Sequence, residues 1–515
     1  MKKVMIALTL LLVLCAVCIG LASCGNATPS TKPTGEGLAF ALNKEGNGYV
    51  VTGRGTCEGV HIVIPETHEG YPVTSIGEGA FRGCESFTSI TIPDSVTSIG
   101  EDAFWGCKNL ISITIPDSVT NIGSSAFYGC TSLTSITIPD SVTRIGGTAF
   151  SRCSSLTSIT IPDGVISIGN ETFYCCTSLK SVTIPDGIMS IGDYAFSGCS
   201  SLTSVTIPDG IMSIGDYAFS GCSSLTSITI PDSMTSIAKG TFSGCSGLTS
   251  ITIPDSVTRI GGYAFSGCSG LTSITIPDGV TSIGYSAFSR CTGLTSITIP
   301  DGVTSIGMNA FLGCDSLTSI TIPDGVTSIG RGTFSECWSL AYNEYQNGKY
   351  LGNAQNPYIV LVDTITTDFS SFEIVSTTKV IYSEVFRECR NLTSITIPDG
   401  VTSIGYSAFS RCTGLTSITI PDSVMSIDEF AFSFCTSLKS ITIPDGVTSI
   451  GIQAFTDCTS LTSITIPDGV TSIGEFAFSK CDKVTIYCEA ESKPDGWDGK
   501  WNFYQRPVDW DYKGE

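Results

Sequence analysis

A strict period of 23 residues constrains this chain more than any other feature of its sequence. Cysteine recurs at that spacing twelve times over positions 84–337 and five times over positions 389–481. Residues 182–204 and 205–227 are identical. Self-similarity at such a period is typical of stacked repeat architectures. The 515 residues therefore predict one long solenoid with a continuous core, although the length would suffice for several globular domains.

One repeat unit, from Leu110 to Cys130, follows the template L-x-x-I-x-I-P-D-x-V-x-x-I-G-x-x-A-F-x-x-C. Ile113 and Ile115 alternate with threonine, which indicates a half-buried strand. Pro116 and the aspartate after it favour a type I turn. The Ile-Gly-x-x-Ala-Phe segment is too short for a full helix and predicts one helical or 3-10 turn. About nineteen coils at roughly 4.8 Å per stacked strand would give a rod of about 90 Å.

The template resembles the leucine-rich repeats of bacterial BspA-like surface proteins over about residues 48–488. The resemblance implies a leucine-rich repeat solenoid with a β-strand and a short helical or 3-10 turn in each coil. It also implies a non-catalytic adhesin that attaches to host matrix proteins, host cells or other bacteria. Two alternatives stay open, a glycan-capturing surface lipoprotein and a passive structural or immune-decoy coat.

The predicted organisation follows the repeat and its interruptions. The following segments are expected: an N-terminal cap over residues 38–76, regular repeats over 77–340 and 389–481, irregular repeats with an aromatic insertion over 341–388, and a C-terminal cap over 482–515. The two caps are expected because a terminal coil needs a lid on its open apolar side.

The N-terminus reads as an export signal. Two lysines precede an almost wholly apolar run over residues 4–21, and the sequence Leu-Ala-Ser-Cys ends at Cys24. This end resembles a bacterial lipobox, which implies a signal peptide over residues 1–23, lipidation of Cys24 and a flexible tether over 24–37. The expected location is the cell envelope, lipid-anchored in the membrane and exposed at the cell surface. A plain secretory signal or an uncleaved anchor is the alternative.

Charge and composition exclude several functions. Asp and Glu outnumber Lys and Arg by 47 to 26, so the net charge is −21. Nucleic acid is therefore not a predicted partner, because binding it requires neutralised phosphates. The only histidines are His61 and His68, and no nucleotide-binding, metalloprotease or serine-hydrolase motif occurs. We predict that the chain is not an enzyme and has no cofactor.

Two repeated columns of polar side chains could carry chemistry. The repeat cysteines favour buried free thiols, with Cys57, Cys175, Cys488 and the ends of the column as the candidates for a disulfide. Cysteine in a single column is a poor metal centre. The repeated turn aspartates, such as Asp94 and Asp117, favour plain turn chemistry. A cation-binding edge for Ca²⁺, or for a basic partner, is the alternative.

Aromatic residues interrupt or end the repeats in two places. Trp338, Tyr342 and Tyr345 lie in the irregular region, where they predict either a packing irregularity or a contact patch for sugar or peptide. Trp497 and Trp501 lie in the last segment, where they predict either an apolar lid or a carbohydrate platform.

A third set of aromatic residues lies beside the Ala-Phe pair of the repeats. Here the units differ most, so selectivity could reside along this edge, although packing between coils accounts for any single residue. These residues are Trp105, Tyr128, Tyr194, Tyr217, Tyr263, Tyr285, Tyr406, Phe430 and Phe476.

Overall fold

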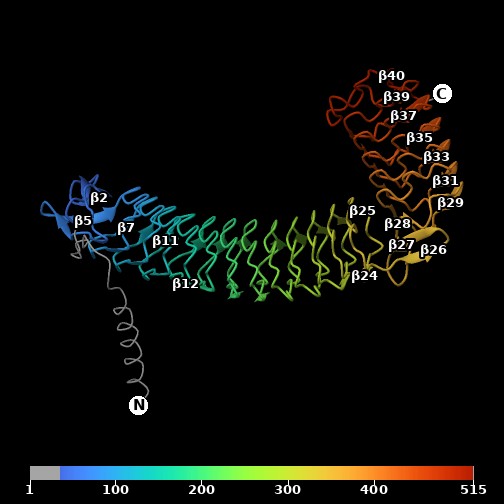
Figure 1. The fold of residues 1–515 in the computed structure, drawn as a ribbon. Helices are drawn as coiled ribbons and strands as arrows, with labels where there is room; N and C mark the ends of the chain where they lie inside the picture. The colour runs from blue at the N-terminus through green and yellow to red at the C-terminus, as the bar shows by residue number, and fades with distance from the viewer. Residues whose placement is uncertain (1–34, 514–515) are drawn as a thin grey trace, which may run out of the picture.

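The computed structural model describes residues 35–513. The predicted signal peptide, Cys24 and most of the predicted tether lie outside these residues. The described chain is a parallel β-solenoid whose two arms meet at a bend (Figure 1). No helix occurs between residues 35 and 513, and none of the described elements is a helix able to cross a membrane.

Most coils contribute one strand to each of two faces of the solenoid, called here the first face and the second face, and each face is divided into several sheets. The first-face strands are β3 (His61–Val63), β6 (Ser89–Thr91), β8 (Ser112–Thr114), β10 (Ser135–Thr137), β12 (Ser158–Thr160), β14 (Ser181–Thr183), β16 (Ser204–Val205), β18 (Ser227–Ile228), β22 (Ser296–Thr298), β24 (Ser319–Thr321), β29 (Ser371–Glu373), β31 (Ser394–Thr396), β33 (Ser417–Thr419), β35 (Ser440–Thr442), β37 (Ser463–Ile466), β39 (Thr485–Cys488) and β40 (Val508–Trp510).

The second-face strands are shorter and follow the Pro-Asp turn. They are β5 (Tyr71–Ile76), β7 (Ser98–Ile99), β9 (Asn121–Ile122), β11 (Arg144–Ile145), β13 (Ser167–Ile168), β15 (Ser190–Ile191), β17 (Ser213–Ile214), β19 (Ser236–Ile237), β20 (Arg259–Ile260), β21 (Ser282–Ile283), β23 (Ser305–Ile306), β25 (Ser328–Ile329), β28 (Val360–Thr364), β30 (Val380–Ile381), β32 (Ser403–Ile404), β34 (Ser426–Ile427), β36 (Ser449–Ile450) and β38 (Ser472–Ile473).

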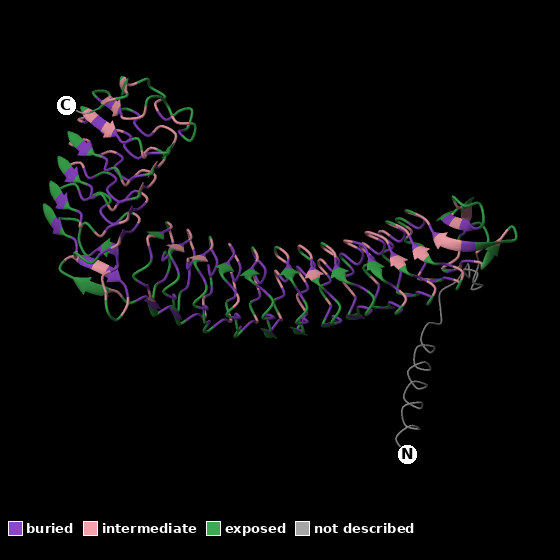
Figure 2. Ribbon diagram, turned by 180° about the vertical axis from the view of Figure 1, so that it is seen from behind, coloured by how far each residue is buried: buried purple, intermediate pink, exposed green. Residues whose placement is uncertain are grey.

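Successive coils pair in register at the sequence period. Ile113 of β8 pairs in parallel with Ile136 of β10, and Ile122 of β9 pairs with Ile145 of β11. Each residue type therefore stacks on its own copy, and the apolar columns merge into one buried core (Figure 2). The phenylalanine of each Ala-Phe pair stacks on the next, as Phe104 does on Phe127 at 5.2 Å between ring centroids. The predicted solenoid with a continuous core is confirmed.

The Ala-Phe segment does not form the predicted helical or 3-10 turn. Ser125 and Gly129 adopt left-handed conformations, with φ of 53° and 69°. Alternate N–H groups therefore leave the local chain, and those of Ser125 and Phe127 donate to Gly147 and Ala149 of the next coil at 3.0 and 2.8 Å. A helix needs consecutive right-handed residues, so it cannot propagate through this pattern.

The repeat cysteines form a buried column of free thiols. The column cysteines among the described residues are free, and so are Cys175 and Cys488, so no disulfide forms between any of them. Each thiol inside the column donates to the carbonyl of a phenylalanine in the preceding coil. Cys130 Sγ, for example, lies 3.2 Å from the Phe104 carbonyl oxygen. Burial raises the pKa of Cys245 to about 12.

We expect these thiols to be unreactive in the folded protein. The thiolate is the reactive form, and burial both hinders access and raises the pKa. Titration with a thiol-specific reagent at neutral pH should detect few cysteines before denaturant is added and most of them after. Rapid labelling of the column in the native protein would contradict this expectation.

The bend lies where the 23-residue period fails. β26 (Asn343–Tyr345), β27 (Gly348–Leu351) and β28 form an antiparallel meander, and β28 then pairs in parallel with β30. On the second face, Thr402 Oγ1 donates to the Thr327 carbonyl at 2.9 Å, although 75 residues separate the two. On the first face, β24 and β29 do not pair with each other. The sheets of both faces are therefore interrupted at the bend, the two arms remain in contact on the second face, and the solenoid bends with that face inside (Figure 1).

Tyr382 fills the core at the bend. It stands where most coils have the glycine of Ile-Gly, and its ring centroid lies 5.6 Å from that of Phe334. The Phe334 N–H donates to the Tyr382 hydroxyl at 3.4 Å. Burial raises the pKa of Tyr382. The tyrosine thus takes the place of a phenylalanine in the column that continues with Phe386.

Each end of the solenoid is covered by non-repeating chain. At the N-terminus, β1 (Ala39–Leu42) and β2 (Tyr49–Gly53) form an antiparallel hairpin, and β2 pairs in parallel with β5. β4 (Thr67–His68) pairs with the start of β5. His68 stacks on Phe40 at 4.1 Å between ring centroids, so it has a structural role in this end of the chain.

Candidate binding surface

The residues that differ between coils form a continuous row on the surface. We call this row the variable edge and define it as the four positions that flank the Ala-Phe pair of each coil. The Ala and Phe themselves are buried in nearly every coil. Tyr194 and Tyr285 of the variable edge are 38% and 37% exposed, so these rings are accessible to a partner.

Aromatic rings of neighbouring coils contact one another along the variable edge. Tyr194 and Tyr217 stack at 5.1 Å between centroids, and Tyr263 meets Tyr285 edge to face at 4.9 Å. Further rings, including Trp105 and Tyr128, stack at 5.6 Å. The same rings therefore pack between coils and remain partly exposed to solvent, as Tyr194 and Tyr285 do.

Cationic side chains lie over several of these rings. The Arg82 guanidinium is 4.6 Å from the centroid of Trp105, and Lys239 Nζ is 5.8 Å from that of Tyr217. Such contacts are worth about 0.5–1 kcal/mol at exposed sites and hold long side chains in place. The edge thus presents ordered aromatic and cationic groups beside its own carboxylates, such as Asp102, which lies 2.7 Å from Arg82.

At the bend, the variable edges of the two arms meet around a small cavity. Arg331 from the first arm lies over Tyr406 from the second, at 4.8 Å from the ring centroid. Met308, Asp428 and Glu429 also line this cavity of about 230 Å³. The site combines a cation, an aromatic ring and two carboxylates that no single coil contains.

Asp428 is the electrostatically unusual group of this cavity. It replaces the glycine of Ile-Gly, and its carboxyl is partly withdrawn from water. Burial raises the pKa of Asp428 above its ordinary value, the Glu429 charge raises it further, and the Arg331 guanidinium opposes both. A raised carboxyl pKa means that ionisation costs folding free energy, so this contribution to stability is lost as pH rises through the raised pKa.

Asparagine does not ionise, so we expect Asp428→Asn to remove the loss of folding free energy that accompanies ionisation of Asp428. The variant should match the parent in melting temperature at low pH, where Asp428 is protonated, and should equal or exceed it at neutral pH. Thermal unfolding across pH measures this difference, and Asp422→Asn at an exposed turn is the matched control. A variant that is less stable at neutral pH would show that the Arg331 attraction dominates.

The structure disperses the aromatic residues of the irregular region. Trp338 is 81% exposed, whereas Tyr342 packs against the core. Tyr345 lies on β26 and contacts Tyr358 at 5.7 Å between centroids. The three residues of the predicted contact patch therefore do not form one aromatic cluster, and Trp338 is the ring among them that is most available to a ligand.

Trp497 and Trp501, for which the sequence left an apolar lid and a carbohydrate platform open, are buried. They are only 2% and 5% exposed, and their centroids lie 4.8 Å apart. Trp497 Nε1 donates to the Val470 carbonyl at 2.9 Å, and Trp501 meets Phe478 edge to face at 6.1 Å. Both rings cover the last coil, because the phenylalanine column would otherwise end against water.

We expect Trp501→Ala to destabilise the C-terminal end by about 3 kcal/mol, the cost of truncating a buried tryptophan. Trp338→Ala is the matched control, since it removes the same side chain from a position that is 81% exposed. Differential scanning calorimetry should show a lower unfolding temperature for the first variant alone. Equal effects of the two substitutions would contradict the assignment of Trp501 as a lid.

The turn aspartates remain single exposed carboxylates. Asp94 and Asp117 are exposed at their turns. Over residues 35–513, no group of three or more His, Cys, Asp or Glu side chains is placed to hold a metal ion. The alternative of a Ca²⁺-binding edge therefore has no preformed ligand set in the part of the chain described.

Sequence reasoning identified Tyr406 but missed its partners at the bend. Arg331 and Asp428 lie 97 positions apart, and no motif connects them. One signal was present, because Asp428 breaks the Ile-Gly pattern that nearly every coil keeps. The signal is not specific, because Ala238 breaks the same pattern within the regular repeats.

The BspA type leucine rich repeat region matches residues 57–176, 166–294, 235–354 and 365–487, which together cover well over half of the chain. No curated protein matches the chain.

Solved structures of bacterial repeat proteins are similar to the chain. A leucine-rich repeat protein from Bacteroides ovatus is 30% identical, with 88% of this chain and 98% of that chain covered and a TM-score of 0.47. A leucine rich cell surface protein from Faecalibacterium prausnitzii is 30% identical, with 94% and 98% covered and a TM-score of 0.28. The pneumococcal vaccine antigen PcpA is 16% identical, with 95% and 100% covered and a TM-score of 0.27.

Proposed function

Because the chain belongs to the BspA-type leucine-rich repeat family, we propose that it is a non-catalytic binding protein of the cell surface. Its proposed role is adhesion to host matrix proteins, host cells or other bacteria through the variable edge. Repeated weak contacts along one rigid row give avidity without a deep pocket.

The exposed tyrosine rings of the variable edge are the observation that carries this proposal, since Tyr194 is 38% exposed and stacks on Tyr217 at 5.1 Å between ring centroids. Tyr194, Tyr217 and Tyr263 occupy the left-handed region, with φ of 55°, 56° and 59°. Gly240 and Gly332 hold the same position in other coils, with φ of 61° and 70°. A non-glycine residue costs about 1 kcal/mol or more there. Other coils place aspartate, serine, threonine or glutamate at this position, as Asp102 and Thr148 do with φ of 53° and 58°, so the strain is common to the repeat. The exposure of the tyrosine rings is what supports a role for them in binding.

The matched test replaces these tyrosines by the residue that other coils already use. We expect Tyr194→Gly with Tyr217→Gly to keep the melting temperature, because glycine relieves the left-handed strain. Binding of the purified full chain to arrays of host matrix proteins should fall, because two exposed rings are lost. Ser125→Gly, at the same position of a coil without a ring there, is the control.

Glycan capture is the second candidate, and the exposed ring of Trp338 favours it. Glycan arrays probed alongside the protein arrays separate the two functions. Binding to glycans that is lost in Trp338→Ala would replace adhesion by glycan capture. Binding to neither array would contradict both adhesion and glycan capture and would favour a passive coat protein.

The proposed location is the cell envelope, with Cys24 lipidated and the solenoid displayed outside. The lipobox-like sequence ending at Cys24 supports it. We expect Cys24→Ala to block precursor processing and to release the protein from the membrane fraction. Protease added to intact cells should remove the parent protein, and full protection would contradict surface display.

A further inference from the structure

β29 is an open strand edge on the outside of the bend. Within residues 35–513 it pairs with β31 alone. The strand that would precede it is missing, because β26 pairs with β27 in an antiparallel hairpin. At the facing end of the first arm, the Ile322 N–H donates to the Gly352 carbonyl at 3.0 Å. β24 and β29 are thus both edge strands at this gap, and β24 is partly covered by the chain around Gly352.

The register shows which main-chain groups face the gap. The Ser370 carbonyl accepts the Thr393 N–H at 3.0 Å and so points toward the second arm. Main-chain groups alternate in direction along an extended strand. The N–H and C=O groups of Ser371 and Glu373 therefore point away from β31. They form a row of two donors and two acceptors that another extended chain can complete.

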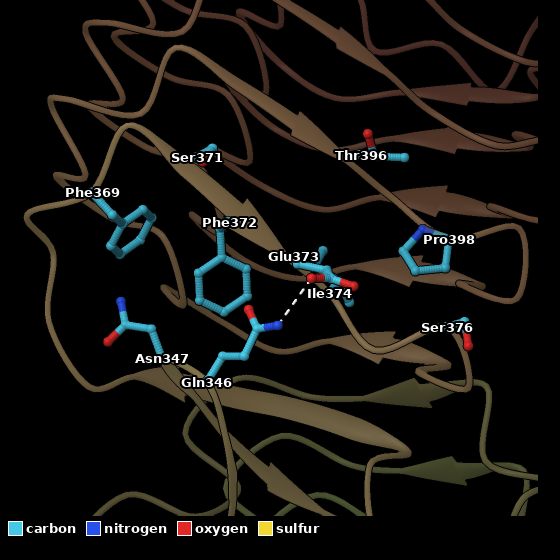
Figure 3. Close-up of a pocket in the computed structure, with 10 residues that line it drawn as sticks. All are labelled: Gln346, Asn347, Phe369, Ser371, Phe372, Glu373, Ile374, Ser376, Thr396 and Pro398. Atoms are coloured by element: carbon cyan, nitrogen blue, oxygen red, sulfur yellow. Dashed lines mark hydrogen bonds between the residues drawn. The ribbon is translucent and has the colours of Figure 1, made fainter.

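The gap beside this edge is a cavity of about 570 Å³ (Figure 3). Phe369 and Phe372 supply apolar surface on the β29 side, and Gln346 and Asn347 approach from the hairpin tip. A single hydrogen bond crosses the space, from Gln346 Nε2 to Glu373 Oε2 at 2.9 Å. Rotation of one exposed glutamine side chain opens the edge.

The far wall of the cavity is held in place independently of its contents. The Ile365 N–H donates to the Asn347 carbonyl at 2.8 Å. The Thr366 N–H donates to Asn347 Oδ1 at 3.1 Å. The cavity is therefore preformed, which lowers the ordering cost of a ligand that enters it.

The charges at the cavity favour a basic ligand. Glu373 is the one charged residue among the described residues that line it. Asp368 and Asp399 adjoin lining residues in the sequence and are exposed, whereas Lys379 Nζ lies beside Gly400 and opposes the Asp399 charge. A chain with a net charge of −21 adds a long-range attraction for cations.

We propose that β29 binds an extended, lysine- or arginine-bearing segment of a partner protein as an added strand. Main-chain hydrogen bonds to Ser371 and Glu373 supply the pairing, Phe369 and Phe372 accept apolar side chains, and the basic residue lies at the Glu373 carboxylate. Strand addition of this kind gives affinity through the backbone and specificity through alternate side chains. The site lies outside the bend and does not depend on the variable edge.

The test uses the full chain and a fluorescein-labelled peptide of alternating valine and threonine with a lysine at each end. We expect saturable binding by fluorescence anisotropy and slower amide exchange at residues 371 and 373. Two control peptides dissect the contacts. N-methylation of alternate amides should abolish binding, and glutamate in place of lysine should weaken it.

Two variants test the edge and the cavity separately. Ser371→Pro removes one N–H that faces the gap and should weaken binding about tenfold, the effect of losing a main-chain hydrogen bond. Gln346→Trp fills the cavity from the hairpin tip and leaves β29 intact, so it keeps the test valid if the proline variant does not fold. Tyr194→Gly should bind the peptide like the parent.

Peptide binding that survives both N-methylation and Gln346→Trp would overturn the proposal. Exchange protection elsewhere than β29 would also overturn it. Sedimentation of the protein alone tests the other occupant, since self-association abolished by Ser371→Pro would mean that a second copy of this chain covers the edge.

Discussion

The close approach of successive coils is the constraint on which the rest of the structure depends. A Cβ atom on Gly100 would lie 2.8 Å from the Glu78 nitrogen of the preceding coil. The Gly100 N–H instead donates to the Ile76 carbonyl at 2.8 Å. The glycine of Ile-Gly thus sets the spacing at which isoleucine stacks on isoleucine and phenylalanine on phenylalanine. Each thiol then meets a carbonyl of the coil before it, which explains a column of cysteines without disulfides.

A uniform core leaves the surface free to vary. Because every buried position packs against its own copy, a substitution at the variable edge disturbs only nearest neighbours. The left-handed residues beside the Ala-Phe pair turn every second N–H toward the next coil, and their side chains toward solvent. The positions that most constrain the backbone are in this way also positions at which tyrosine and arginine occur, as at Tyr194 and Arg152.

The bend adds two surfaces that the repeat cannot make. On its inner side, Arg331 and Tyr406 bring the two variable edges together around a cavity. On its outer side, β29 keeps an unpaired edge beside a second cavity. Both arise from one event, the departure of β26 from the coil path. The proposed adhesive row and the proposed strand-addition site are consequently separate in space and separable by mutation.

Much of the fold followed from the sequence because each coil has its own copy as its neighbour. The alternation around Ile113, the free cysteine column and the solenoid were predictable for that reason. The helical turn was predicted wrongly, since nothing in the composition of Ser125 or Tyr194 announces a left-handed conformation that contacts with the next coil impose. The lid role of Trp501 stayed one of two alternatives, because burial depends on how the last coil ends.

The sequence by itself determined the period, the in-register core and the row of variable positions, since these require only that each residue packs against the equivalent residue of the next coil. Tertiary structure alone decided the direction of the second arm and the residues that meet there. Between Cys337 and Cys389 the repeat has no copy to pair with, so the path depends on contacts such as Thr402 with Thr327 across 75 residues. Contacts of that range carry no local signal, and for this reason the bend and its two surfaces became visible only in three dimensions.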